Sequence, residues 1–341
     1  MAPSSLTHPE WNHETGGLEV ARAFPDRIKG KKVLITGVSP ESIGSSIALS
    51  IASQSPELLL LASRTTSKLE QVVGNIRHSH PDVHIALVSL DLMSQDSIKA
   101  AAAQVTILTD RLDLIINNAA IMTQERLRSE EGIEGQFATC HIGHFLLTNL
   151  LMPQILSAAK SNPPGATRII NVSSLGHLIS PIRFSDYNIT GKHVPPEERN
   201  PAPLPPMFSA AKPDGYNGWM AYGQAKTANI LFSLSLTEKL KNRGVASYAL
   251  HPGSISTGLS RNLDAQGDAA IRNMIDFWKN HDQGAATVLV AALDPALDDS
   301  SKGIMLSDCQ IYEPAPWATD SATAERLWIL SETLVKRDFK L

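Results

Sequence analysis

The chain has 341 residues, of which 43% are hydrophobic and 19% charged, so it is neither disordered nor fibrous and is long enough for one large domain. The formal net charge is −4 and lysine and arginine form no cluster, which argues against a nucleic-acid partner and against a membrane contact made by charge. Two cysteines, Cys140 and Cys309, make no disulfide framework, so we expect a reducing compartment and a cytoplasmic location.

Residues 1–30 are polar and are predicted to form an N-terminal extension. They lack the basic start, apolar middle and small-residue cleavage site of a secretory signal. No apolar run in the sequence approaches the roughly 20 residues that a membrane-spanning helix needs. We therefore expect a soluble protein with no membrane partner.

From residue 31 onward, short apolar segments alternate with longer helical ones. The predicted strands are 32–36, 58–62, 84–90, 112–118, 167–173 and 245–251. The predicted helices are 43–53, 67–78, 95–109, 133–159 and 220–243. Short apolar strands separated by helices indicate a parallel sheet with right-handed crossovers. The fold class is therefore α/β, a doubly wound parallel sheet (Rossmann fold) with helices on both faces, in a single domain at 31–341.

A proline-rich segment at 186–219 interrupts this alternation. It holds seven of the 21 prolines of the chain, and such a segment suits neither a helix nor a central strand. Loops of this length inside a compact domain are usually functional or disordered. We interpret it as an insertion that shapes the substrate pocket; the alternative is a surface insertion without a role.

The first predicted strand runs into a turn from Thr36 to Gly44, and a helix follows. Free N–H groups and the helix dipole at such a turn favour a pyrophosphate, with Gly37, Ser39, Ile43 and Gly44 as candidate contacts. By itself this signal also fits an ordinary turn.

Arg64 follows the second predicted strand, some 20 residues beyond Gly44. An acidic residue at this place would bind a ribose 2′-hydroxyl, whereas an arginine suits a 2′-phosphate. No acidic residue adjoins Arg64, so the sequence favours NADP(H) over NAD; the alternative is a solvated surface arginine.

Tyr222 and Lys226 lie four residues apart at the start of a predicted helix and so share one face. A nearby ammonium group is expected to lower the pKa of the Tyr222 phenol and make it a general acid or base. Ser174 follows the strand at 167–173, at the sheet edge where ligands bind, and its hydroxyl would hold a substrate oxygen.

Together these residues resemble the short-chain dehydrogenase/reductase family from Lys31 to Val335. The supporting motifs are Thr36 to Gly44, Asp91-Leu92, Asn117-Asn118-Ala119-Ala120, Ser173-Ser174, Tyr222 to Lys226 and His251-Pro252-Gly253 with Thr257. Further phrases at 143–151, 170–177, 221–232 and 307–320 resemble the retinol-dehydrogenase and WW-domain-oxidoreductase branch, in its fungal or plant form.

The resemblance implies roles for these residues. Tyr222 would be the proton donor or acceptor, Lys226 would bind the nicotinamide ribose, and Ser174 would orient the carbonyl group. The remaining cofactor contacts that it implies are Asp91 at the adenine, Asn118 and Ala119 in the cleft, and Pro252, Gly253 and Thr257 beside the nicotinamide and pyrophosphate.

The sequence departs from the family pattern at three places. The turn from Gly37 to Gly44 lacks the middle glycine and is one residue longer. Cys140 stands where the branch has an asparagine that helps to hold a water relay to the lysine; a cysteine is a weak hydrogen-bonding group, and here it is either part of an altered relay or an apolar filler. Ser174 and Tyr222 are 48 positions apart because the proline-rich segment lies between them.

The sequence thus predicts an NADPH-dependent enzyme that reduces a ketone or aldehyde, or oxidises the alcohol, of a small apolar molecule. One alternative is a cofactor-assisted cyclisation, dehydration or isomerisation on the same fold, and a second is a non-catalytic NADP-binding protein. We expect no metal site, because the histidines are not spaced with carboxylates or cysteines. The predicted partner is a small-molecule substrate, and the chain would be a monomer or a homodimer.

Overall fold

The computed structural model describes residues 5–261, 269, 272, 275, 277–298 and 304–341. Within these residues, eight strands form one sheet in the order β3-β2-β1-β4-β5-β6-β7-β8, parallel except for the last pair. The strands are β1 (Lys32–Thr36), β2 (Leu58–Ser63), β3 (Ile85–Ser89), β4 (Leu114–Asn117), β5 (Thr167–Val172), β6 (Val245–His251), β7 (Ile304–Ser307) and β8 (Gln310–Tyr312). The predicted doubly wound sheet is confirmed, with its change of direction between β1 and β4.

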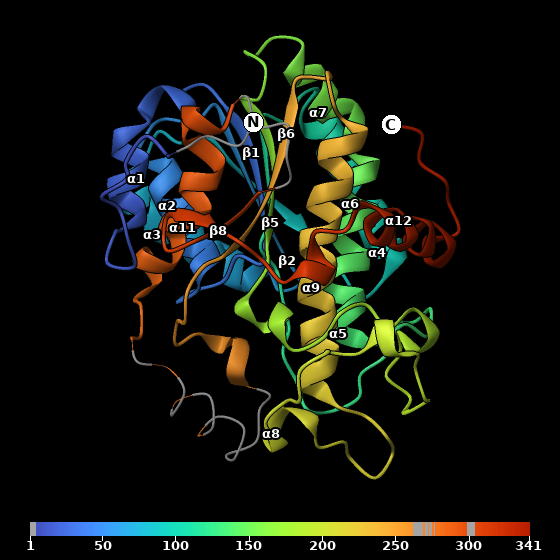
Figure 1. The fold of residues 1–341 in the computed structure, drawn as a ribbon. Helices are drawn as coiled ribbons and strands as arrows, with labels where there is room; N and C mark the ends of the chain where they lie inside the picture. Colours follow the sequence, from blue (N-terminus) through green and yellow to red (C-terminus); the bar gives the residue numbers. More distant parts are fainter. Residues whose placement is uncertain (1–4, 262–268, 270–271, 273–274, 276, 299–303) are drawn as a thin grey trace.

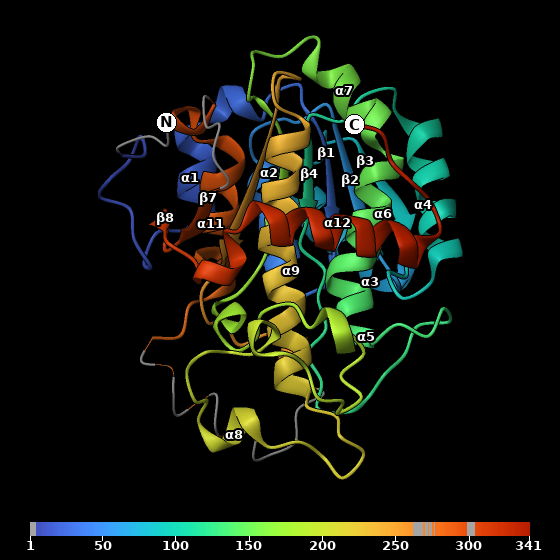
Figure 2. The same ribbon diagram turned by 45° about the vertical axis from the view of Figure 1, so that its right-hand side comes forward.

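Helices cover both faces of the sheet (Figure 1). One face carries α1 (Gly17–Ala23), α2 (Ile43–Ala52), α3 (Thr66–Ser79) and α11 (His281–Leu293), and the other carries α4 (Gln95–Leu108), α6 (Gly143–Leu150), α7 (Met152–Ala159) and α9 (Gly218–Lys239). The last helix, α12 (Ser321–Val335), lies across α9 and α6 (Figure 2). Each face therefore has its own apolar core, built from the strand residues that point to that side.

The residues before β1 pack against the layer of helices formed by α2 and α11. Val20 and Ala21 of α1 are fully buried in this core. Asp282 of α11 accepts a hydrogen bond from the Leu18 N–H at 3.0 Å, and Asp294 accepts one from the Thr7 N–H at 3.0 Å. The N-terminal extension is thus held by side chains that lie more than 250 residues further along the chain.

The helix predicted over 133–159 is divided into several pieces. It comprises α5 (Gly135–Phe137), one π-helical turn at Ala138–Ile142, α6 and α7. The axis bends by 59° between Gly135–Leu150 and α7, because Pro153 in the first turn of α7 has no N–H to continue the earlier helix. In the described part of the chain no single helix has the length and apolar composition to span a membrane. The bent pair Gly135–Leu150 and α7 reaches that length and composition only when its two parts are counted together.

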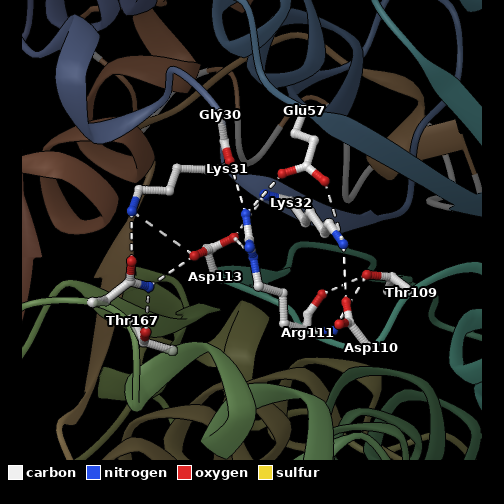
Figure 3. Close-up of polar contacts among 10 residues, drawn as sticks. Gly30, Lys31, Lys32, Glu57, Thr109, Asp110, Arg111, Asp113 and Thr167 are labelled. Carbon is white, nitrogen blue, oxygen red and sulfur yellow. Dashed lines mark hydrogen bonds and ion pairs between the residues drawn. The ribbon is translucent and has the colours of Figure 1, made fainter.

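A buried carboxylate joins the amino ends of three strands (Figure 3). Asp113 is 2% exposed and accepts hydrogen bonds from the Lys32 N–H at 2.8 Å and from the Asn162 amide at 2.7 Å. The same amide donates to the Thr167 hydroxyl at 2.8 Å, and the Arg111 guanidinium lies 3.5 Å from the carboxylate. Asp113 thereby connects the starts of β1, β4 and β5.

Replacing Asp113 by alanine is expected to lower the free energy of unfolding by about 2–4 kcal/mol, because the buried partners of a charged group lose their acceptor. Urea unfolding followed by circular dichroism measures the change. Asp110→Ala is the matched control, since the Asp110 side chain is 85% exposed in its contact with Lys32. A midpoint as low in the control as in Asp113→Ala would contradict the prediction.

Candidate active site

A cleft opens at the carboxyl edge of the sheet, where the strand order changes direction. Its walls come from the segments that follow β1, β2, β3, β4 and β6, together with α9. The lining residues are Gly37, Ser39, Ser42, Ile43, Gly44, Ala62, Ser63, Arg64, Thr65, Lys68, Leu90, Asp91, Leu92, Asn118, Ala119, Ala120, Ile121, Thr139, Val172, Ser173, Tyr222, Lys226, Pro252, Thr257, Gly258 and Leu259. All the predicted cofactor-binding residues but one, Gly253, line this cleft.

The turn between β1 and α2 is ordered by its serines. Ser42 caps α2 by accepting a hydrogen bond from the Ser45 N–H, and the Ser45 hydroxyl accepts the Ser42 N–H in return. Within the described residues, the N–H groups of Ile43 and Gly44 have no acceptor, so they remain available to an anion in the cleft.

The longer turn is accommodated without disturbing this end of α2. Glu41 adopts a left-handed conformation with φ 52°, points to solvent and is not among the lining residues. Gly44 has to be a glycine, because a Cβ there would lie 2.6 Å from the Gly37 carbonyl oxygen. The extra residue and its negative charge are therefore turned away from the place where a phosphate would lie.

Two cations stand at one end of the cleft. Arg64 and Lys68 line it, are exposed, and have no carboxylate partner among the residues that the structure describes. Arg64 was predicted from its position after β2, whereas Lys68 was missed. Its signal is its place in the first turn of α3, the helix that begins two residues after Arg64.

Tyr222 and Lys226 both face the cleft from the first turns of α9, as predicted. The Lys226 ammonium lies 5.6 Å from the centre of the Tyr222 ring and donates a hydrogen bond to the Val172 carbonyl at 2.9 Å. The Ser174 side chain lies beside Tyr222, where it lowers the pKa of the phenol, and its hydroxyl accepts the Gly176 N–H at 3.0 Å, whereas the neighbouring Ser173 hydroxyl donates to the Lys226 carbonyl at 2.7 Å. The geometry thus brings Ser174, Tyr222 and Lys226 together and distinguishes Ser174 from Ser173.

The predicted lowering of the Tyr222 pKa is wrong for the protein alone. Burial raises the pKa of the phenol well above its usual value of 10, proximity to Cys140 raises it further, and the hydrogen bond to Ser174 opposes both effects. The physical reason is dehydration, since Tyr222 is only 7% exposed and burial disfavours the charged phenolate. Tyr222 is therefore a neutral phenol that holds a proton to donate.

Cys140 lies behind the cleft, in the π-helical turn. It is 1% exposed, its Sγ lies 3.8 Å from the Ile121 carbonyl oxygen, and burial raises the pKa of its thiol. Its own carbonyl accepts hydrogen bonds from the Asn229 amide at 2.7 Å and from His144 Nδ1 at 3.0 Å. Cys140 thus stands near Lys226 as a small buried group and not as a nucleophile.

Gly253, which is predicted to flank the cofactor, follows directly on the cleft residue Pro252. Its φ is 101°, and a Cβ there would lie 2.5 Å from Cδ of Lys279. The Lys279 ammonium is in turn 2.6 Å from Asp308, in the turn between β7 and β8. The absence of a side chain at Gly253 accommodates this lysine, while Pro252 and Thr257 on either side line the cleft.

The proline-rich segment supplies part of an apolar wall beside Tyr222. Phe208, in the one-turn helix α8 (Pro206–Ser209), packs edge-on against Trp219 with ring centres 5.4 Å apart. Met122 completes the contact with Trp219 and Tyr222. The predicted insertion therefore does contain short helical turns, a 3-10 turn at Pro196–Glu198 and α8, and both begin at prolines, the residues that suit a first turn.

One buried amide fixes this segment to the catalytic helix. Asn217 caps α9 by accepting the Met220 N–H at 2.9 Å, and its amide group donates to the carbonyls of Phe208 at 2.8 Å and Ala210 at 3.1 Å. Arg126, outside the insertion, contacts both of its ends: it binds the Asp214 carboxylate near the last residues and the carbonyls of Asn188 and Ile189 near the first. The insertion is thus attached to the fold at both ends.

A nicotinamide dinucleotide fits the residues of the cleft. The free N–H groups at the start of α2 suit its pyrophosphate. Because Gly44 has no side chain, the backbone there can approach the pyrophosphate closely. A metal is a poorer match: among the described positions, no three His, Cys, Asp or Glu side chains gather in a way that would hold an ion.

Comparisons with known proteins point to one family. The family model for short chain dehydrogenases matches residues 31–193. Chloroplastic short-chain dehydrogenase TIC 32 A of Brassica napus is 37% identical over 82% of this chain and 81% of its own length. Retinol dehydrogenase 13 of Homo sapiens is 34% identical over 95% of this chain and 89% of its own.

Solved structures agree on the fold. A crystal structure of an uncharacterized protein from Mycobacterium paratuberculosis has a TM-score of 0.68 at 26% identity, and it covers 94% of this chain and 98% of that one. A carbonyl reductase from chicken fatty liver, solved with bound NADPH, has a TM-score of 0.55 at 22% identity over 82% of this chain and 97% of its own. The second likeness concerns the fold alone.

Proposed function

The chain belongs to the short-chain dehydrogenase family of oxidoreductases, in the branch of the retinol dehydrogenases and TIC 32, and we propose that it is an NADPH-dependent carbonyl reductase. The observation that carries this proposal is the meeting of Tyr222, Ser174 and Lys226 at a cleft suited to a dinucleotide. The same residues serve the reverse oxidation of the alcohol.

When bound, NADPH supplies a hydride to the carbonyl carbon. Tyr222 donates its proton to the carbonyl oxygen, so that the carbonyl gains one hydride and one proton and becomes an alcohol. Ser174 holds that oxygen by a hydrogen bond in the orientation that Tyr222 requires. The Lys226 ammonium stabilises the negative charge that Tyr222 carries once its proton has left.

The wall beside Tyr222 favours an apolar substrate. Met122, Trp219, Ile179, Phe208 and Leu259 pack around the tyrosine from separate segments of the chain. A pocket with mostly apolar walls and a few convergent polar groups binds molecules with a single polar function. We therefore assign the substrate as a small apolar ketone or aldehyde.

The cofactor preference rests on Arg64 and Lys68. Replacing both by alanine is expected to weaken NADPH binding about 10- to 100-fold, because hydrogen bonds to a phosphate from charged groups are lost, and to leave NADH binding unchanged. Fluorescence titration with each nucleotide measures the two affinities. Arg77→Ala, at the far end of α3 and away from the cleft, is the control. Equal losses for NADPH and NADH would contradict a 2′-phosphate contact.

The reaction itself is tested by NADPH consumption with a panel of aliphatic and aromatic ketones and aldehydes. Oxidation of NADPH with formation of the matching alcohol supports carbonyl reduction. Tight NADPH binding with conversion of a substrate but no consumption of NADPH would favour a cofactor-assisted rearrangement instead. We also propose a cytoplasmic protein that is a monomer or homodimer and acts on a small molecule; light scattering and fluorescence microscopy of the tagged protein test these two statements.

A further inference from the structure

A buried histidine that does not line the cleft contacts the segments on both sides of it, the end of β1 and the π-helical turn. His144 of α6 is 1% exposed and does not line the cleft. Its Nε2 lies 2.8 Å from the Thr36 hydroxyl, at the end of β1, and its Nδ1 lies 3.0 Å from the Cys140 carbonyl oxygen, in the π-helical turn. The reaction described above uses no atom of this side chain.

The partners of His144 determine which nitrogen carries the proton. A carbonyl oxygen only accepts, so Nδ1 is the donor to Cys140. Burial lowers the pKa of His144 to about 4, which keeps the ring neutral at physiological pH, and Nε2 is therefore an acceptor. The Thr36 hydroxyl consequently donates to Nε2, and one directed chain of hydrogen bonds runs from Thr36 through His144 to Cys140.

At its first end this chain reaches the dinucleotide half of the cleft. The Thr36 hydroxyl accepts the N–H groups of Asn118 and Ala119, each at 3.0 Å. The Asn118 amide also donates to the Thr36 carbonyl at 2.8 Å, and Gly37 follows directly in the chain. Gly37, Asn118 and Ala119 all line the cleft. The hydroxyl that binds His144 thus sets the distance between the ends of β1 and β4.

At its second end the chain reaches the catalytic half. The Cys140 carbonyl accepts a second hydrogen bond, at 2.7 Å, from Asn229, which stands three residues after Lys226 in α9. Thr139, beside Cys140, lines the cleft. The two donors to this carbonyl fix the π-helical turn against α9, close to the residues that carry the reaction.

We propose that His144 is a positioning residue that couples the dinucleotide turn to the Lys226 segment of α9. The contribution of Lys226 to cofactor binding then depends on His144, although the two side chains belong to different helices. The inference rests on the proposed function only in requiring that the cleft binds a nicotinamide dinucleotide. It predicts an energetic coupling that a histidine serving merely as core packing would not produce.

The test uses the full chain and the dissociation constants of NADPH and NADH. His144→Asn keeps the donor to Cys140, as Asn149 shows by donating to the Phe145 carbonyl at 2.9 Å in the same helix, but does not reach Thr36. We expect it to weaken binding about tenfold, the effect of one lost hydrogen bond in a buried network. Thr36→Val should lose at least as much, because it also removes the acceptor of the Asn118 and Ala119 N–H groups, and Thr36→Ser should restore most of the affinity. The double variant His144→Asn/Thr36→Val should be no weaker than Thr36→Val alone.

A second cycle tests the coupling across the cleft. Lys226→Met should weaken binding about tenfold in the wild type but less than about threefold in the His144→Asn background. Asn149→Leu is the matched control, because it removes a buried hydrogen bond of the same kind and should lower the melting temperature without changing the affinity.

Additive effects of Lys226→Met and His144→Asn, or an affinity loss in Asn149→Leu equal to that in His144→Asn, would overturn the inference while the wild type still binds. A wild type that binds neither nucleotide would overturn the dinucleotide site itself, and this inference with it. The two failures are therefore distinguishable.

Discussion

Replacing Tyr222 by phenylalanine is expected to lower kcat for carbonyl reduction about a thousandfold, with NADPH affinity within about threefold of the wild type. The change removes one oxygen from a side chain that is 7% exposed and otherwise keeps its apolar contacts with Met122 and Trp219. Without the phenol, the carbonyl oxygen loses its proposed proton donor. Initial rates and a fluorescence titration measure the two quantities separately.

Tyr216→Phe is the matched control for this experiment. Tyr216 is also buried, and its hydroxyl donates to Glu134 at 2.8 Å and accepts from Gln136 at 3.0 Å, but it does not line the cleft. We expect the control to lose about 1–3 kcal/mol of unfolding free energy and to keep its kcat. Turnover that persists in Tyr222→Phe at the wild-type level would exclude the tyrosine as proton donor.

Lys226→Met is expected to lower kcat by about 100- to 1000-fold and also to weaken NADPH binding, which separates it from the tyrosine variant. Besides its hydrogen bond to the Val172 carbonyl, the ammonium has two roles in the proposed reaction to lose: it supports the charge that forms on Tyr222, and it faces the cleft that would hold the dinucleotide. Methionine retains the length and apolar stem of the side chain, so the fold should be preserved. Steady-state rates at saturating and subsaturating NADPH distinguish the two losses.

The pH dependence of the wild-type enzyme follows from the same lysine. Burial lowers the pKa of the Lys226 ammonium from its ordinary value of 10.5, and Cys140 opposes this shift. The charged form is present below that lowered pKa and is lost as the pH rises through it. Carbonyl reduction should therefore decline on the alkaline side below pH 10.5, whereas Tyr222, with its raised pKa, keeps its proton there. A kcat/KM profile that stays flat up to pH 10.5 would contradict this assignment.

The first six strands were predictable because most of their residues are buried and apolar, with β3 the one that is partly exposed. KVLIT and VASYALH coincide with β1 and β6 to the residue. The pair β7 and β8 was missed, because the strands have four and three residues and the turn between them carries no glycine, asparagine or proline. Asp308 and Cys309 occupy that turn with φ values of 49° and 62°; an aspartate tolerates this left-handed conformation, but a cysteine does not signal it.

The candidate site was predictable where residue types follow strand ends or helix spacing. Those rules identify Arg64, Ser174, Tyr222 and Lys226. The structure places Arg64, Tyr222 and Lys226 in the lining of one cleft and Ser174 beside Tyr222. What the sequence did not predict depends on packing. The π-helical turn at Ala138–Ile142 has no sequence signature here, and the pKa of Tyr222 depends on how much water the surrounding side chains exclude.

Because Asn217 both caps α9 and binds the proline-rich segment, the residues that select the substrate and the residues that carry the reaction lie on different parts of the chain. The segment that supplies Phe208 leaves the domain near Asp186, whose carboxylate binds its own loop backbone, and returns at the amide that begins the catalytic helix. Between these two anchors the segment supplies Phe208 to the apolar wall, while the start of the helix is fixed by Asn217. Changes in the proline-rich segment would therefore alter which substrate fits the pocket and leave Tyr222 and Lys226 in place.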